Sequence, residues 1–316
     1  MSQQTPVLAI VGPTGSGKTD LSIELAELIG AEIINADSRQ VYRKLDIGSA
    51  KPTPAQQQRV RHHLIDVVDP DETFDAARFR ALALEAVADI TARGKRVLVV
   101  GGTGLYVKVL RGGLFDGPSR DAQLRARLQA EEAAAPGSLH RRLAQVDPTT
   151  ASRLHVRDRV RLIRALEVFE LSGQPISEWQ QRHGFRNADV RLQGVVLSLP
   201  RAEVYRRIDA RCAAMVASGL VEEVRALLDA GYDPQLPSLQ SPGYREISEH
   251  VRGMCDLNAA LARMAKATRN LAKRQLTWFR GDKEAVWVEP SLTAVVREAR
   301  LLWPGCADTQ IASARG

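Results

Sequence analysis

Cysteine is scarce in this chain, with three among 316 residues, and none of the three forms a CxxC pair. Cys212, Cys255 and Cys306 are odd in number and widely separated, which argues against a disulfide framework or a cysteine-based zinc site and fits a reducing compartment. His62 and His63 are adjacent but have neither a nearby cysteine nor an HExxH pattern, so we expect no metal site there.

Long hydrophobic runs are also absent. No stretch of about 18 apolar residues occurs, so we expect no helix that spans a membrane. The first residues, MSQQTPVLAIVG, lack the basic and long apolar segments of a signal peptide. We therefore expect a cytoplasmic protein, acting as a monomer and without a membrane partner. Hydrophobic residues make up 44% of the chain, which is enough for a packed core and excludes a disordered tail protein.

Acidic residues are the minority among the charged ones. Lys and Arg total 44 against 37 for Asp and Glu, which leaves a net charge of 44 − 37 = +7. A basic surface favours polyanions such as nucleic acid or phosphorylated substrates, and general basicity without such a partner is the alternative. Residues 120–164 carry ten arginines and five acids.

Short apolar runs alternate with helical patterns over the first hundred or so residues. Strands are predicted at 7–11, from 33 to 37 and at 97–100, with a helix over 79–90. This alternation indicates a parallel sheet with helices on both faces.

The pattern becomes helical near Gly117-Pro118. We interpret residues 119–190 as a helical insertion domain, and residues 1–118 with 191–316 as the α/β core that it interrupts. Within the second part of that core, a strand is predicted at 194–199, helices from 202 to about 280, and a short strand at 286–288.

A phosphate-binding loop follows the first strand. Its pattern, G-x-x-x-x-G-K-[ST], is met by Gly12, Pro13, Thr14, Gly15, Ser16, Gly17, Lys18 and Thr19. Glycines let several N–H groups point at one anion, and the start of a helix adds partial positive charge. Lys18 would neutralise phosphate oxygens, and the Thr19 hydroxyl would hold Mg²⁺. The loop in this context indicates an α/β fold like that of the P-loop NTPases.

The acidic residue that usually binds Mg²⁺ next to such a loop does not occur at its usual place in this sequence. Walker-type enzymes place an Asp for Mg²⁺ after a later strand, but the strand at 97–100 runs into Gly101-Gly102-Thr103. An acid, Asp37, follows the second strand instead, where ligands of parallel sheets bind. On these grounds a general base, a Mg²⁺ ligand and a helix N-cap all remain open as its role.

Several blocks in order carry a family resemblance. They are GPTGSGKT (12–19), INADSRQVYRKLDIGSAKP (34–52), HHLIDVVDP (62–70), GGTGLYVK (101–108), RLIRALEVFELSGQPIS (161–177), GYRE (243–246) and LAKRQLTWFRG (271–281). Over about 280 residues the chain resembles the bacterial tRNA dimethylallyltransferases, also called tRNA isopentenyltransferases.

The resemblance implies a reaction and its residues. A dimethylallyl group would pass from dimethylallyl diphosphate to the exocyclic amine (N6) of adenosine 37 of tRNA, in the anticodon stem-loop, after the base leaves its stack. Asp37 corresponds to the family's proposed base, Thr103 lies near the reacting groups, and Arg211 contacts the diphosphate. Lys18 and a Thr19-bound Mg²⁺ would stabilise the leaving diphosphate.

The resemblance also implies a set of tRNA contacts. They are Asp37, Ser38, Arg39 and Gln40; Thr103; Arg125; Arg161, Leu162, Ile163, Arg164 and Ala165; Gln240, Ser241, Pro242, Gly243, Tyr244 and Arg245; and Lys273, Arg274, Gln275, Leu276, Thr277, Trp278, Phe279 and Arg280.

The last of these segments has a charge pattern of its own. Residues 263–280 hold six basic side chains and no acid. Helical spacing places Lys266, Arg269, Lys273 and Arg280 on one side, and Met264, Leu271 and Trp278 on the other. The pattern suits phosphates, with a solvated basic face as the alternative.

Three other functions share the phosphate loop. They are a small-molecule kinase that uses ATP, a dimethylallyltransferase acting on free adenine nucleotide, and a non-catalytic RNA-binding switch. The displaced acid argues against the first, the basic segments against the second, and Asp37 beside a complete loop against the third.

Overall fold

The computed structural model describes residues 4–184 and 189–306 of the chain. The chain separates into two compact units, an α/β unit (1–111 and 189–316) and a helical unit (112–188). The helical unit begins before residue 119, the boundary that the sequence suggested, because Phe115 already belongs to its core and lies 6.3 Å from the Trp179 ring.

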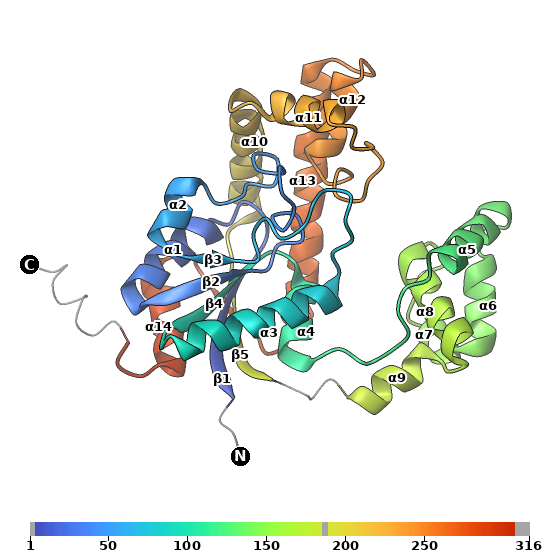
Figure 1. Ribbon diagram of the computed structural model, residues 1–316, viewed down its shortest axis with the longest axis horizontal. Helices are drawn as coiled ribbons and strands as arrows, with labels where there is room; N and C mark the ends of the chain where they lie inside the picture. Colours follow the sequence, from blue (N-terminus) through green and yellow to red (C-terminus); the bar gives the residue numbers. More distant parts are fainter. Residues whose placement is uncertain (1–3, 185–188, 307–316) are drawn as a thin grey trace, which may run out of the picture. The chain divides into compact units, whose positions relative to one another are not determined.

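A six-stranded sheet forms the centre of the α/β unit (Figure 1). The strand order is β3-β2-β4-β1-β5-β6, and every neighbouring pair is parallel. The strands are β1 (Thr5–Val11), β2 (Ala31–Asn35), β3 (His62–His63), β4 (Arg96–Gly101), β5 (Val190–Leu197) and β6 (Val286–Val288). Since β4 lies between β1 and β2, the carboxyl ends of these three strands are neighbours.

Helices cover both faces of the sheet (Figure 1). One face packs against α1 (Lys18–Ile29) and α14 (Leu292–Leu302), and the other against α3 (Ala76–Ala92). The helix α4 (Gly104–Gly112) contacts α3, where the Tyr106 and Phe79 rings stack. Strand side chains alternate between faces, so a strand buried on both is apolar throughout. The first face has a continuous core that includes Leu8, Ile10, Ile23, Leu25, Leu98 and Val295.

A second core joins the C-terminal helices of the α/β unit to the loop after β2. Its helices are α10 (Arg201–Ala217), α11 (Leu220–Asp229), α12 (Tyr244–Val251) and α13 (Leu257–Arg280). The Glu223 carboxylate accepts hydrogen bonds from the backbone N–H groups of residues 46–48, the one from Ile47 at 2.7 Å, and from the Tyr244 hydroxyl at 2.6 Å. Those contacts fix the loop that lines the site described below.

The helical unit has a core of its own. Its elements are α5 (Ala122–Ala134), α6 (Ser138–Val146), α7 (Pro148–Ala151), α8 (Arg159–Ser172) and α9 (Ile176–His183). Beside the apolar residues, Glu167 is fully buried and accepts hydrogen bonds from Arg125 and Arg164 and from the Asp121 backbone N–H. Burial of this carboxylate is tolerated because its oxygens have several donors.

The fold predicted from the sequence is confirmed, because the sheet is parallel and each predicted strand has a counterpart in it. Two of the predicted strands begin and end later than the observed ones: the strand predicted at 33–37 is Ala31–Asn35, and the one predicted at 194–199 is Val190–Leu197. Three elements were not foreseen, the two-residue strand β3, the short helix α2 (Pro54–Arg59) and α14. Over the described ranges, no helix is both long enough and apolar enough to cross a membrane.

Candidate active site at the carboxyl edge of the sheet

The phosphate loop connects β1 to α1. Gly15 and Gly17 both have φ of +83°, a left-handed conformation that side chains disfavour, and α1 begins immediately afterwards at Lys18. The loop therefore presents backbone N–H groups and a helix N-terminus together, as an anion site requires.

Lys18 is turned back onto this loop. Its ammonium donates to the carbonyls of Gly12 at 3.0 Å and Pro13 at 2.8 Å. Loss of water around the ammonium lowers the pKa of Lys18 to about 8; nearby Asp37 opposes that change and Arg211 adds to it. A bound anion would stabilise the charged form and offers the ammonium a better partner than two carbonyls.

Arg211, on α10, reaches the same loop. One terminal nitrogen donates to the Thr14 hydroxyl, while Nε is buried and has no hydrogen-bond partner among the described residues. Burial lowers the pKa of the guanidinium, although Asp37 raises it. A buried, unpaired donor is costly unless a ligand completes it, which fits an anion-binding arginine.

Asp37 lies two residues beyond β2. Its carboxylate accepts from the Arg39 backbone N–H at 2.8 Å, and its own N–H donates to the Asn35 side-chain oxygen at 3.2 Å. Residues 38–41 form a turn. The helix N-cap role that the sequence left open is therefore wrong, because Asp37 caps a turn and not a helix.

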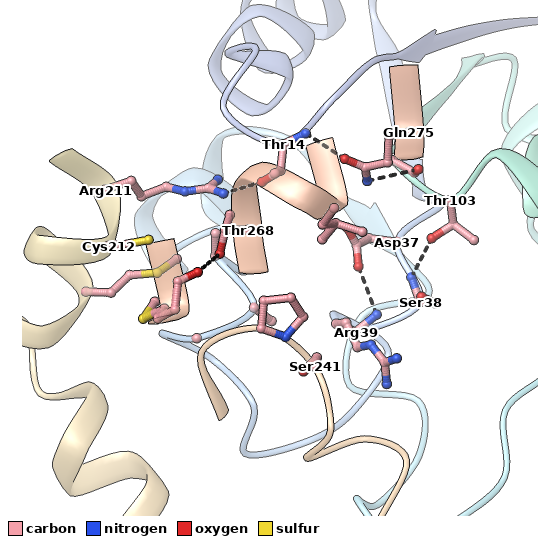
Figure 2. A pocket seen from close by; sticks show the side chains of 18 of the residues that line it. Thr14, Asp37, Ser38, Arg39, Thr103, Arg211, Cys212, Ser241, Thr268 and Gln275 are labelled. Carbon is pink, nitrogen blue, oxygen red and sulfur yellow. Dashed lines mark hydrogen bonds between the residues drawn. The ribbon is translucent and has the colours of Figure 1, made fainter. Parts of the chain in front are cut away.

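Thr103 faces this turn from the end of β4. Its hydroxyl accepts from the Ser38 N–H at 3.0 Å, and its own N–H donates to the Ala36 carbonyl at 3.1 Å (Figure 2). The two segments approach this closely because Gly101 has no side chain: a Cβ there would lie 2.2 Å from the Ala36 oxygen. The backbone thus brings Thr103 and Asp37 together.

Three cavities lie along this edge. The first, about 350 Å³, is lined by Asp37, Thr103 and Arg211 among others (Figure 2). The second, about 340 Å³, lies at the helix end of the phosphate loop and is lined by Lys18, Thr19 and Arg211. A third of about 70 Å³ shares lining residues with both, including Thr14, Asp37 and Arg211 with the first and Lys18, Thr19 and Arg211 with the second. The loop and the Asp37 turn therefore line neighbouring cavities that share walls.

About half of the expected tRNA contacts in the α/β unit line the first cavity. Its walls include Ser38, Arg39, Gln240, Ser241, Pro242, Arg274 and Gln275. Gln40 lines the smallest cavity, and its amide donates to the carbonyls of Ser49 and Ala50. Gly243, Tyr244 and Phe279 are buried, and Arg245 pairs with Glu246. The three buried residues can contribute little to a tRNA-binding surface, whereas Arg245 is exposed despite its ion pair and stays available to one.

The C-terminal half of α13 is mostly exposed. Lys273, Arg274, Thr277, Trp278 and Arg280 are exposed, whereas Gln275 and Leu276 are half-buried. The spacing argument placed Trp278 on the packed side of the helix, but its residue surface is 37% exposed. It still contacts the β4–α4 junction, because Gly104 leaves room for its indole ring.

The basic stripe on α13 is partly neutralised. Arg269 pairs with Asp209, and its guanidinium lies 5.9 Å from the centre of the Tyr205 ring. Lys266 and Lys273 are exposed on the same helix. The exposed positive charge of the stripe is therefore smaller than the sequence count suggests.

In the helical unit, the expected contacts fall into two groups. Arg161 is exposed and lies 3.4 Å from Asp158. Arg125 and Arg164 are paired with Glu167. Leu162, Ile163 and Ala165 are buried in the core of the unit, where their side chains support the helix.

Sequence reasoning missed one wall of the first cavity. It consists of Cys212, Met215, Met264, Thr268 and Leu271. The sequence did carry a signal for this wall. Positions 264, 268, 271 and 275 are three or four residues apart, so they lie on one face of a helix, and the last of them is polar. This wall adds apolar surface next to the charged loop.

The comparisons with known proteins agree with this geometry. The family model described as IPP transferase matches residues 40–282. The tRNA dimethylallyltransferase of Geobacter metallireducens is 50% identical over 289 residues, covering 91% of this chain and 93% of the relative. A tRNA dimethylallyltransferase 1 from Citrifermentans bemidjiense is 51% identical over 284 residues, 90% of this chain and 92% of the relative.

Solved structures show the same relationship. The full-length tRNA isopentenylpyrophosphate transferase of Bacillus halodurans has a TM-score of 0.70 at 34% identity, covering 99% of this chain and 100% of the other. A eukaryotic dimethylallyltransferase acting on tRNA has a TM-score of 0.77 at 27% identity, over 91% of this chain and 74% of the other. The chain therefore belongs to the IPP transferase family.

Proposed function

We propose that this protein transfers the dimethylallyl group of dimethylallyl diphosphate to N6 of adenosine 37 in tRNA, giving N6-dimethylallyladenosine and diphosphate. One observation carries the proposal: in a member of the IPP transferase family, the phosphate loop, Arg211 and the Asp37–Thr103 pair line neighbouring cavities that share walls. A donor held by the loop would direct its allyl group toward the carboxylate.

The loop side of the site suits a diphosphate leaving group. Cleavage of the allylic C–O bond places negative charge on the departing diphosphate. The loop N–H groups and the unpaired Nε–H of Arg211 are donors that are in place before the charge develops, and the Lys18 ammonium can exchange its two loop carbonyls for diphosphate oxygens. Stabilisation of this kind lowers the barrier because little reorganisation is needed.

The residues present fit the Mg²⁺ ion that the family implies. Thr19 and Asp37 line the 70 Å³ cavity together, and hydroxyl and carboxylate oxygens are ligands that Mg²⁺ prefers. Thr19 would hold the ion, with Asp37 within the same cavity. When bound, it would add positive charge next to the diphosphate oxygens.

The carboxylate side suits an amine acceptor. The adenine amine is a weak nucleophile, and loss of its proton as the C–N bond forms makes transfer favourable. Asp37 would accept that proton. The Thr103 hydroxyl accepts a hydrogen bond from the Ser38 N–H, and this bond fixes the turn next to Asp37. The target base must leave its stack to enter the cavity, and exposed Lys273 and Arg274 lie on the helix that lines it.

A transfer assay that combines two labelled donors with two acceptors distinguishes the competing functions. Dimethylallyl diphosphate labelled in the allyl group, or ATP labelled in the γ-phosphate, is incubated with tRNA or with AMP. We expect label only in tRNA and only from the allyl donor, and none with Lys18→Ala. Transfer to AMP would favour the free-nucleotide enzyme, and phosphoryl transfer from ATP would favour the kinase.

A further inference from the structure

The side chain of Gln275 lies inside the site and not on the surface of α13. Its amide oxygen accepts from the Thr14 backbone N–H at 2.8 Å, and its amide nitrogen donates to the Gly102 carbonyl at 3.0 Å (Figure 2). One amide thus joins α13 to the phosphate loop and to the end of β4. The resemblance had assigned this residue to tRNA contact.

Glycines in the 101–104 segment leave the space that Gln275 and Trp278 of α13 occupy. A Cβ at Gly102 would lie 2.2 Å from the Gln275 amide nitrogen, and a Cβ at Gly104 would lie 2.0 Å from the Trp278 ring. Each distance is too short for a side chain. The glycines therefore allow α13 to lie directly on the backbone that carries Thr103.

Thr14 is held from two directions. Gln275 binds its N–H, and Arg211 binds its hydroxyl. Thr14 lies within the phosphate loop, so these two contacts fix the conformation of the loop before any ligand binds. Preorganised sites of this kind lose rate when a supporting hydrogen bond is removed, even where the reacting groups remain.

We propose that Gln275 is a positioning residue for the transfer reaction, fixing the phosphate loop relative to the end of β4 that carries Thr103 and thereby relative to the Asp37 turn. The proposal rests on the proposed function. The role requires a donor and an acceptor on one side chain of this length. Glutamate keeps the acceptor but lacks the donor at neutral pH, and methionine of similar length has no donor and only a weak thioether acceptor.

The chemistry of Gln275→Glu supplies a sharp test. At neutral pH its carboxylate faces the Gly102 carbonyl without a hydrogen between them, and we expect the single-turnover rate at saturating donor and tRNA to fall by about 10–100-fold. As the pH falls, the carboxyl group gains a proton and can donate again. Because position 275 is half-buried and the carboxylate would face a carbonyl oxygen, the pKa of the introduced acid should lie above its ordinary value of about 4.3. The ratio of the variant rate to the wild-type rate should therefore rise from pH 8 to pH 5.5.

Two further variants complete the design. Asn270→Asp makes the same amide-to-acid change at an exposed position of α13 and should leave the rate ratio independent of pH. Gln275→Met should lower the rate as much as Gln275→Glu at neutral pH, without recovery at low pH, while its melting temperature shows that it is folded.

The outcomes are distinct. An inactive wild type would overturn the proposed function itself. An active wild type matched at every pH by Gln275→Glu, or a wild-type rate in folded Gln275→Met, would overturn only the role of Gln275. A lowered Gln275→Glu rate with a ratio that does not change with pH would also count against it, since simple loss of packing predicts that result.

Discussion

Donor binding is expected to weaken at alkaline pH because of Lys18. The pKa of its ammonium is lowered to about 8 by loss of surrounding water. An anion is bound by the protonated form. Below pH 8 that form dominates, whereas above pH 8 binding must first recover the proton, so affinity falls as the pH rises.

The size of the effect follows from this pKa. At pH 7 most Lys18 side chains carry their proton, whereas at pH 9 only about one molecule in eleven does. The apparent Kd for dimethylallyl diphosphate should therefore rise about tenfold from pH 7 to pH 9, which is about 1.4 kcal/mol of binding free energy. A lysine with an ordinary pKa near 10.4 would change the Kd by only a few per cent over the same range.

Equilibrium binding of labelled donor without tRNA, measured from pH 7 to 9.5, reports this dependence. Lys18→Arg is the control, because its guanidinium stays charged and its Kd should be constant. Asp37→Asn removes the neighbour that raises the Lys18 pKa, so its Kd should begin to rise at a lower pH. A wild-type Kd that stays constant up to pH 9.5 would refute the electrostatic account of the loop.

Two other variants, one single and one double, test the helical unit and the polyanion surface. Glu167→Ala leaves Arg125 and Arg164 without their shared carboxylate, and we expect a loss of about 2–3 kcal/mol in unfolding free energy, measured by urea denaturation; an unchanged midpoint would contradict this. Replacing Lys266 and Lys273 by Ala should weaken tRNA binding and reduce the slope of log K against log salt by roughly 0.7–0.9 for each tRNA phosphate that is no longer neutralised, whereas an unchanged slope would identify a merely solvated face.

Local sequence patterns predicted the parts of this structure that depend on near neighbours. The phosphate loop requires glycines at fixed spacing and a helix directly after it, and both are visible between Gly12 and Thr19. The apolar runs of β1, β2 and β4 predicted a buried parallel sheet. Asp37 could then be predicted as a site residue, because it follows one of these strands and the carboxyl ends of parallel strands are neighbours.

Other features depend on contacts between distant segments. The bond from Thr14 to Gln275 joins residues that are far apart in sequence, and nothing local to either predicts it. The same is true of Arg269, whose partner Asp209 lies on another helix. Helical spacing placed Trp278 on the packed side of its helix, but it could not predict that the indole ring contacts Gly104, more than 170 residues earlier in the chain.

The most direct test of the account is the single-turnover transfer rate of Asp37→Asn at pH 7, with donor and tRNA saturating. Asparagine keeps the shape and can still accept the Arg39 N–H, but it cannot take a proton from the amine. We predict a rate about 10²–10⁴-fold below wild type, with a donor Kd changed by less than about threefold. A weaker donor Kd with recovery at high Mg²⁺ would identify a metal ligand instead, and a wild-type rate in the folded variant would contradict the proposed chemistry.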